Sequence, residues 1–528
     1  MFENQPKGLW TLALANTGER FGYYTMLAVF ALFLGENFGF AAGTASEIYT
    51  WFLTLVYFLP LFGGIAADRF GYSKMVVIGI VVMFFGYVLL SVPLGGGTLA
   101  VIAMGAALLL VSAGTGMFKG NLQVMIGDLY NDPRYADKRD SGFSLFYMLI
   151  NVGALFAPTA AIKAMEWAQV SLGYSKADSY HFAFAVACIS VIISILIYYF
   201  GMPTFRQVLT VKKAEKKTGE KAEDLNPAET KERMICLVLV FLVVIFFWMA
   251  FNQNGLTLTW FADEFTATES TGVQSMLFDV TNLVACIFIV YGIFGIVQST
   301  AAKSRTIYAA LMVLAIAFLG YKYSEIPDVT SLSAPIFQQF NACFVVMLTP
   351  VSIALFAWLA KKGKEPKAPV KIGLGMLVAA VAYLIMTIWS VGLPLSNHPQ
   401  HVADVTPNLL VGTYLILTFA ELLLSPIGIS FVTKVAPAKY RGMMMGGWFV
   451  ATALGNKLVS IPGHMWDMPL PVVWGTLMGI CLIAAGFRYS NASIRWLKIT
   501  LRDNYKNMVE SSKGFDPIWL LPIGGIML

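Results

Sequence analysis

The chain alternates between long apolar runs and short polar breaks along most of its length. Runs such as 75–92, 182–201 and 234–251 carry no charge and approach the roughly 20 residues that a helix needs to cross a bilayer core. The pattern predicts about fourteen membrane-spanning helices. They are expected near residues 9–35, 46–67, 75–93, 98–127, 141–164, 182–201, 234–260, 276–298, 306–322, 336–360, 371–391, 407–433, 441–462 and 469–494.

The composition supports this all-α, polytopic membrane fold. Hydrophobic residues make up 58% of the 528 and charged residues only 12%, whereas soluble domains carry about 25% charged residues. A soluble protein of this length cannot bury so much apolar surface, while a protein in contact with lipid does not need to. We therefore expect an integral multi-pass membrane protein that is surrounded by lipid.

Lysine and arginine collect in alternate loops, and the loops between them carry almost none. The basic groups lie at 69–74, 134–139, 206–233, 303–305, 361–367, 439–441 and from 495 onward. Because positive loops stay on the cytoplasmic side, both termini are expected in the cytoplasm. The net charge of +6 then reflects membrane topology, and a nucleic-acid partner is disfavoured because no aromatic residues interleave with a basic patch.

The polar segment 202–233 mixes charges of both signs and predicts a cytoplasmic linker. It separates an N-terminal bundle of six helices, residues 1–201, from a C-terminal bundle of six helices, residues 234–496, and residues 497–528 form a cytoplasmic tail. The pair of helices at 276–322 is an insertion in the second bundle. Because its interior is almost free of charge, we interpret it as a lateral hairpin facing lipid; a dimerisation or regulatory surface is the alternative.

Four charged residues fall inside predicted helices: Glu19, Arg20, Lys119 and Glu421. Counted from the cytoplasmic boundaries at a rise of ~1.5 Å per residue, all four lie about 20 Å up, near the middle of the membrane. Charges at this depth usually face a bundle interior or a wet cavity. We expect Lys119 and Glu421 to face each other across a central polar cavity, so that protonation of the carboxylate would weaken a tie between the bundles. The alternative is that these charges pair only to hold helices together.

The cysteines and histidines give no sign of a metal site. The five cysteines lie in apolar stretches, and the four histidines, His181, His398, His401 and His464, fall at the outer ends of helices or in outer loops. No cofactor is therefore expected other than a coupling proton, which the carboxylates would carry. No cluster of a nucleophile with a base appears either, so an enzyme is disfavoured.

Several sequence motifs lie within or beside the predicted helices. GGIAADRFGYSK at 63–74 resembles the loop motif of the major facilitator superfamily, in which Gly64 is expected to permit close helix packing. More specific motifs are ERFGYY at 19–24, GTGMFKGN at 114–121, FYMLINVGALFAP at 146–158, FWMAFNQNG at 247–255, AELLLSPIGISFVTKVAP at 420–437 and MMGGWFVATALGN at 444–456. These resemble the motifs of the proton-dependent oligopeptide transporter family, within that superfamily, and follow the order of the family along most of the chain.

This resemblance implies a secondary active transporter that imports di- and tripeptides in a bacterial inner membrane. Lys119 and Glu421 would engage opposite ends of the peptide, and Glu19 with Arg20 would link proton binding to rearrangement. The residues implied to contact the peptide are Arg20, Tyr23, Tyr24, Tyr57, Lys119, Asn151, Trp248, Asn341, Glu421, Ser425 and Trp448, and those implied in proton coupling are Glu19, Arg20, Lys119 and Glu421. The resemblance implies no obligate protein partner.

The chain departs from the family pattern at charged positions. Asn16 replaces a glutamate in the first motif, Leu27 stands where many members carry an arginine, and Asn252 stands where an acid is usual. Because acidic and basic positions are both neutral here, no buried charge is left without an opposite charge, and the losses compensate one another. They leave Glu19 and Glu421 as the carriers of any proton coupling. They also leave open an alternative cargo of amino-acid-like or other small anionic solutes, with altered or absent coupling. A channel is disfavoured because the charges form one central site rather than rings.

Overall fold

The computed structural model describes residues 5–130, 132–135, 139–206, 227–299, 301–366, 368–396, 405–437 and 441–486. The first part of the chain forms helices only. They are α1 (Lys7–Phe38), α2 (Ala42–Phe58), α3 (Pro60–Phe70), α4 (Tyr72–Ser91), α5 (Thr98–Leu129), α6 (Arg139–Leu172), α7 (Lys176–Gly201) and the 3-10 turn η2 (Met202–Phe205). We call α1–α7 the N-terminal group.

The second part is also helical, apart from one short antiparallel pair, β1 (Glu269–Ser270) with β2 (Thr330–Ser331). Its helices, which we call the C-terminal group, are α9 (Pro227–Phe251), α10 (Thr257–Glu264), α11 (Val280–Gln298), α12 (Ala302–Ser324), α13 (Gln339–Lys361), α14 (Ala368–Trp389), α15 (Pro407–Val435), α16 (Arg441–Leu458), α17 (Ser460–His464) and α18 (Leu470–Gly486). The 3-10 turns η3 (Asn252–Gly255), η4 (Gly272–Phe278) and η5 (Ala334–Gln338) lie between them.

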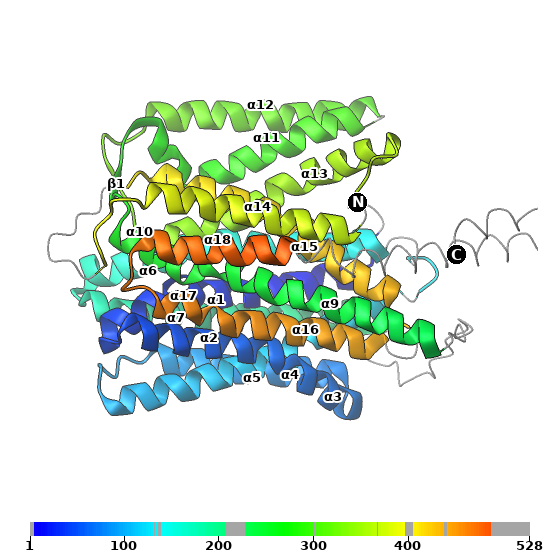
Figure 1. The fold of residues 1–528 in the computed structure, drawn as a ribbon, viewed down its shortest axis with the longest axis horizontal. Coiled ribbons are helices and arrows are strands. Elements are labelled where there is room, and N and C mark those ends of the chain that lie inside the picture. The colour runs from blue at the N-terminus through cyan, green and yellow to red at the C-terminus, as the bar shows by residue number, and fades with distance from the viewer. Residues whose placement is uncertain are drawn as a thin grey trace, which may run out of the picture.

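Among the described residues, eleven helical segments are long and apolar enough to cross a membrane. The helices lie side by side along one axis (Figure 1), and their outward surfaces carry large apolar side chains such as Phe85, Ile102 and Ile189. Such surfaces match hydrocarbon rather than water, and helices satisfy their backbone polar groups internally. The prediction of an all-α, multi-pass membrane protein is confirmed.

Two predicted boundaries are corrected by the structure. The helix predicted from 234 begins at Pro227, a residue suited to the first helical turn because it has no N–H to leave unsatisfied. Residues 227–233 of the predicted linker are therefore helical, while 207–226 lie outside the described residues. The helix predicted over 234–260 is also not continuous. It gives way to η3 and resumes as α10.

Gln253 stabilises this break by bonding to the chain on both sides of it and to a neighbouring segment. Its Nε2 donates to the carbonyl oxygens of Met249 (3.0 Å) and Val459 (3.2 Å), and its Oε1 accepts from Thr257 Oγ1 (2.7 Å). The backbone groups freed by a helix break need replacement partners inside a membrane protein. This amide also attaches the break to the segment that joins α16 to α17.

Glycine permits close packing in the N-terminal group, but not at the position predicted. A Cβ on Gly63 would lie 2.1 Å from the carbonyl oxygen of Gly116, so α3 and α5 touch through their backbones there. A Cβ on Gly64 would meet nothing within 4 Å. The expectation for Gly64 is wrong, because the contact face of α3 is displaced by one residue.

The predicted insertion forms a hairpin of α11 and α12 at the edge of the molecule (Figure 1). Gly295 lies directly against the ring of Tyr308. At the end of the hairpin opposite its turn, Lys322 Nζ lies 2.7 Å from Asp279 Oδ2. In the most apolar stretch of α12, only 6% of the residues are buried within the protein. The hairpin thus packs on the rest of the described protein mainly through α11, and its contact with lipid and its role stay predictions.

The two helix groups meet at the end of the molecule that contains the start of α2 and the whole of α17, which we call the distal end. Gln338 Nε2 donates to Ala28 O (3.1 Å), and Thr159 Oγ1 donates to Gln339 Oε1 (3.1 Å). A Cβ on Gly255 would lie 2.0 Å from the Tyr49 hydroxyl, so η3 and α2 are also in close contact. The groups are thus joined at the distal end by both packing and hydrogen bonds.

Candidate functional site

Glu19 and Arg20 form a closed pair on α1. Arg20 Nε and Nη2 each donate to one Glu19 carboxylate oxygen at 2.5 Å, and both side chains are buried. The guanidinium also lies over the Tyr23 ring, 4.6 Å from its centroid. A bidentate pair of this kind satisfies both charges in a low-dielectric interior.

Lys119 projects from α5 toward α2 and lies on an aromatic face. Its Nζ is 4.1 Å from the centroid of the Tyr57 ring, and Glu19 and Arg20 lie within its electrostatic range. In the part of the chain that the structure describes, Lys119 forms no ion pair with a carboxylate. A cation held by a single tyrosine side chain, through its ring and its hydroxyl, retains donors for an anion.

Glu421 lies in the middle of α15, and its partner is an amide rather than a cation. Asn341 Nδ2 donates to Glu421 Oε2 (3.1 Å) and to Thr418 Oγ1 (3.0 Å). Glu421 is 8% exposed, and its carboxylate is close enough to Tyr24 for the two groups to interact electrostatically. A carboxylate offers about four lone-pair positions, so most of its accepting capacity is unused.

Lys119 and Glu421 border the same group of tyrosines. Tyr147 on α6 lies within electrostatic range of Glu421, Tyr24 and Tyr57, yet it is 45% exposed. Tyr24, Tyr57, Lys119, Asn341 and Trp248 are also partly exposed. Partly exposed polar groups from both helix groups therefore lie near one another around these tyrosines. The two charges form no ion pair with each other, so the expected direct tie between them is absent in this conformation.

Among the polar atoms of the C-terminal group that are buried without a hydrogen-bond partner, two belong to predicted site residues: Trp248 Nε1 and Ser425 Oγ. Ser425 lies one helical turn after Glu421 on α15, and Trp248 lies four residues before the break at η3. Buried polar atoms are usually paired, because leaving one unpaired costs about 1–3 kcal/mol. Unpaired atoms in a predicted binding site are therefore available to a ligand.

The remaining predicted residues divide between packing and polar contacts. Tyr23 is buried and stacks on Phe52, and Asn151 Nδ2 donates to Tyr147 O within α6. Trp448 is 4% exposed, and its ring fills the space left by Gly428 between α16 and α15. Its ring therefore packs helices in this conformation, and its role in a side-chain pocket stays a prediction.

The three neutral residues at positions that are charged in the family pattern have different surroundings. Asn252 Nδ2 donates to Asn456 Oδ1 at 2.5 Å, and Asn456 Nδ2 in turn donates to Leu53 O of α2 at 3.4 Å. Leu27 packs against the apolar core. Asn16 is buried, and its Nδ2 has no partner.

Tyr147 and a second set of charges, at the distal end, were not predicted from the sequence. Tyr147 lies four residues before Asn151, on the same face of a predicted helix, so its spacing was available as a signal. Glu47 of α2 forms an ion pair with Lys457 of α16, and His464 lies close to both. Lys457 lies inside a predicted helix, far from any basic loop, and this exception to the charge pattern could have identified it.

No metal site accompanies these groups. Among the described residues, no three His, Cys, Asp or Glu side chains come together as metal ligands. Cys188, Cys236, Cys286, Cys343 and Cys481 are free. Of the histidines, His181 and His464 are described, and His398 and His401 lie outside the described residues.

These features define a multi-pass membrane protein of the transporter class, with a central polar site between two helix groups. The POT family model matches residues 73–222 and 323–468. The chain is 30% identical to the uncharacterized transporter YclF of Bacillus subtilis, over 92% of this chain and 93% of that protein. The chain belongs to the POT family.

Two further comparisons agree with this assignment. A di-/tripeptide transporter of Lactococcus lactis subsp. lactis is 28% identical, over 92% of this chain and 94% of that protein. A crystal structure of a POT peptide transporter in complex with sulfate superimposes with a TM-score of 0.70, at 23% identity, over 94% of this chain and 96% of the other. That structure supports the fold. The family and its bacterial members indicate an integral protein of the bacterial inner membrane.

Proposed function

We propose that this protein imports di- and tripeptides by proton-coupled alternating access. The observation that carries the proposal is that Lys119 and Glu421, from different helix groups, approach the same group of tyrosines without pairing with each other. A peptide is a zwitterion whose charged ends are several ångströms apart, so it needs separated groups of opposite sign. An ion pair within the site would have to break before the peptide could bind.

The central residues then take the following roles. Lys119 engages the peptide carboxylate and Glu421 the amino group, which replaces part of the water lost by that buried carboxylate. Ser425 Oγ and Trp248 Nε1, both unpaired, bond to the peptide near Glu421. Arg20, Tyr23, Tyr24, Tyr57, Asn151 and Asn341 contact its backbone, and Trp448 lines a side-chain pocket when the helices move. Backbone recognition tolerates many side chains.

Proton coupling rests on Glu19 and Glu421. Asn16 and Asn252 cannot titrate, and the bond from Asn252 to Asn456 joins α9 to α16 without charge. If the neutral positions compensate one another, Asn16→Glu alone will not improve proton-driven uptake. A clear gain in that variant would argue that a coupling site had simply been lost.

The proposed topology has fourteen spanning helices, with both termini and the 202–233 segment in the cytoplasm. The distal end then faces outward, because the basic loops lie at the opposite end. In the major facilitator arrangement, six helices of each bundle rock about the central site. The α11–α12 hairpin lies outside this movement, against lipid.

Uptake of a labelled dipeptide into proteoliposomes, with and without an inward proton gradient, tests the proposal. We expect accumulation only with the gradient. Competition by unlabelled dipeptides, free amino acids and nitrate separates the peptide from the alternative cargo of amino-acid-like or small anionic solutes. Inhibition by free amino acids or nitrate, with none by dipeptides, would replace the proposal with that alternative.

A further inference from the structure

At the distal end, α2 lies against α17 with almost no side chain between them. A Cβ on Gly463 would lie 2.4 Å from Ser46 Cβ, which is closer than two carbon atoms approach. One turn away, a Cβ on Gly43 would lie 3.2 Å from the His464 ring. Each helix contributes a glycine at the position where the other contributes a side chain. We call this contact, together with the charges beside it, the distal gate, because α2 and α17 belong to different helix groups.

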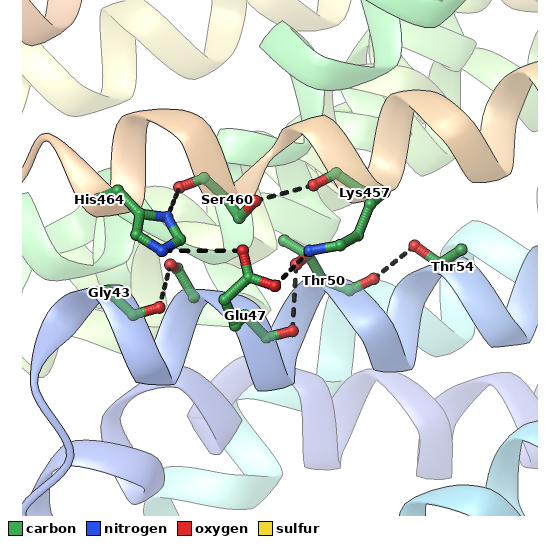
Figure 2. Close-up of polar contacts among 8 residues, drawn as sticks. Gly43, Glu47, Thr50, Thr54, Lys457, Ser460 and His464 are labelled. Carbon is green, nitrogen blue, oxygen red and sulfur yellow. Dashed lines mark hydrogen bonds and ion pairs between the residues drawn. The ribbon is translucent and has the colours of Figure 1, made fainter.

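One carboxylate in the distal gate lies between two basic groups of the opposite helix group. Figure 2 shows Glu47 of α2 between Lys457 and His464. Lys457 Nζ is bonded to Glu47 Oε2, and His464 Nε2 lies 3.7 Å from Glu47 Oε1. The latter distance is within ion-pair range but longer than a hydrogen bond. The interaction between His464 and Glu47 therefore depends on the charge of the imidazole.

The second ring nitrogen determines which tautomer is present. His464 Nδ1 lies 2.9 Å from the Ser460 carbonyl oxygen, which can only accept a hydrogen bond. Nδ1 therefore carries a hydrogen in both charge states. In the neutral ring, Nε2 presents a lone pair to the Glu47 carboxylate. In the protonated ring, Nε2 presents an N–H and a positive charge to the same oxygen, so protonation converts a weakly repulsive contact into an attractive one.

Among the described residues, the groups close to His464 supply no other acceptor for that proton. The ring lies close to Gly43 and Glu47 of α2 and to Ser460 of its own helix. Lys457 is already bonded to Glu47 and presents no acceptor. Asp467 follows in the chain, and Glu264 is occupied by Trp466 Nε1 at 3.0 and 3.2 Å.

We propose that His464 makes closure of the distal gate depend on the pH of the compartment that this end faces. The closed gate places the Glu47 carboxylate beside Nε2, and separation of α2 from α17 removes it, so a protonated ring attracts α2 only when the gate is closed. Closure is therefore favoured when the pH is low and loses this contribution as the pH rises. Imidazole is the side chain that changes charge between about pH 5 and 8. The His464 side chain is 50% exposed, so its proton exchanges with that compartment and is not carried through the protein.

This inference rests on the alternating access proposed above only for its physiological meaning. With the distal end facing outward, an acidic exterior promotes closure behind an incoming substrate. The gate chemistry itself is independent of the cargo. The inference and the proposed function can therefore fail separately.

Double electron–electron resonance between spin labels at Ala41→Cys and Met468→Cys measures the gate directly. Both residues are exposed at the distal end, and the five natural cysteines are replaced by alanine in a background that retains uptake. In nanodiscs without substrate, lowering the pH from about 7.5 to 5.5 should raise the ratio of closed to open gate by up to about fivefold, the effect of one exposed ion pair.

Three variants make the test specific. His464→Asn keeps a donor for Ser460 O but cannot be protonated, so its ratio should respond to pH less than that of the parent, by the share that the imidazole contributes. His464→Lys should favour the closed distance at both pH values, and Glu47→Gln should reduce the response by the same share while leaving the imidazole in place. A full response in His464→Asn, or none in the parent, would overturn the inference. A response without dipeptide uptake would leave the inference standing and refute the proposed function.

Discussion

The middle and the distal end of the interface between the two helix groups differ in whether opposite charges pair across it. At the distal end, Glu47 and Lys457 are in contact across the two helix groups, although both side chains are partly exposed to solvent. In the middle, Glu421 is only 8% exposed and Lys119 is partly exposed, yet they form no ion pair. Pairing is worth more for a buried carboxylate than for an exposed one, yet it is the buried Glu421 that has no cationic partner among the described residues. The difference indicates that the middle is kept ready for a ligand, whereas the distal end is a contact that closes on itself.

Removing the central acid should have the largest effect. Glu421→Gln keeps the shape and the bond to Asn341 but loses the charge that would bind an amine. Because a hydrogen bond to a charged group is worth about 1.5–3 kcal/mol, dipeptide uptake should fall about 10- to 150-fold. An N-acetylated dipeptide, which has no charged amino group, should be affected less than the free dipeptide, because only the role of Glu421 in proton coupling is then lost. Glu166→Gln, at an exposed ion pair with Lys163, is the matched control.

Preventing the backbone contact at the distal end should come next. Gly463→Ala places a Cβ 2.4 Å from Ser46 Cβ, so α2 and α17 must separate. We expect uptake to fall about tenfold, for a closure penalty of about 1.4 kcal/mol, and the spin-label distance to lengthen. Gly475→Ala on α18, where a Cβ meets nothing within 4 Å, should change neither. Unchanged distances in Gly463→Ala would mean that closure does not require this contact.

Removing the unpaired indole donor should give a smaller and more selective effect. Trp248→Phe deletes Nε1, which has no partner in the protein. Loss of a hydrogen bond to the peptide, worth about 1 kcal/mol, should raise KM about fivefold. The temperature midpoint of unfolding should change little, because the Trp248 indole N–H forms no hydrogen bond within the protein that the change could remove. A large loss of stability with an unchanged KM would assign the residue to packing.

Exchanging the charges of the distal gate should have the smallest effect. Glu47→Lys and Lys457→Glu each place like charges together and should shift the gate toward the open state, whereas the double variant restores the attraction. Because these side chains are partly exposed, each single change should alter the closed-to-open ratio by no more than about fivefold. A double variant no better than either single variant would show that the pair contributes nothing to closure.

The sequence predicted the middle of the molecule better than its end. A charge in the centre of an apolar run is conspicuous because its burial is costly, and this identified Glu19, Arg20, Lys119 and Glu421. Lys457 stands out inside a predicted helix, but Glu47 lies near the start of its helix, where charge is inexpensive, and 410 positions separate the two along the chain. Nothing local marks them as partners. The close approach of Gly463 to Ser46 is likewise created by the packing of two groups.

The helix break had a different cause. Residues 234–260 are apolar enough to continue as one helix, and the turn at η3 depends on bonds from Gln253 to Val459 and Thr257. One of these partners lies far along the chain, so the break is a tertiary feature rather than a local preference. The hairpin at 276–322 was predictable because its two apolar runs and the basic turn between them are all local.

The neighbouring positions of Glu19 and Arg20 limit how this pair can transmit a signal. Both belong to one turn of α1, so any tilt or rotation of that helix carries the two side chains together. Mechanical movement alone leaves their mutual geometry almost unchanged. Only a chemical event, such as transfer of a proton to the carboxylate or capture of the guanidinium by another anion, can release one from the other.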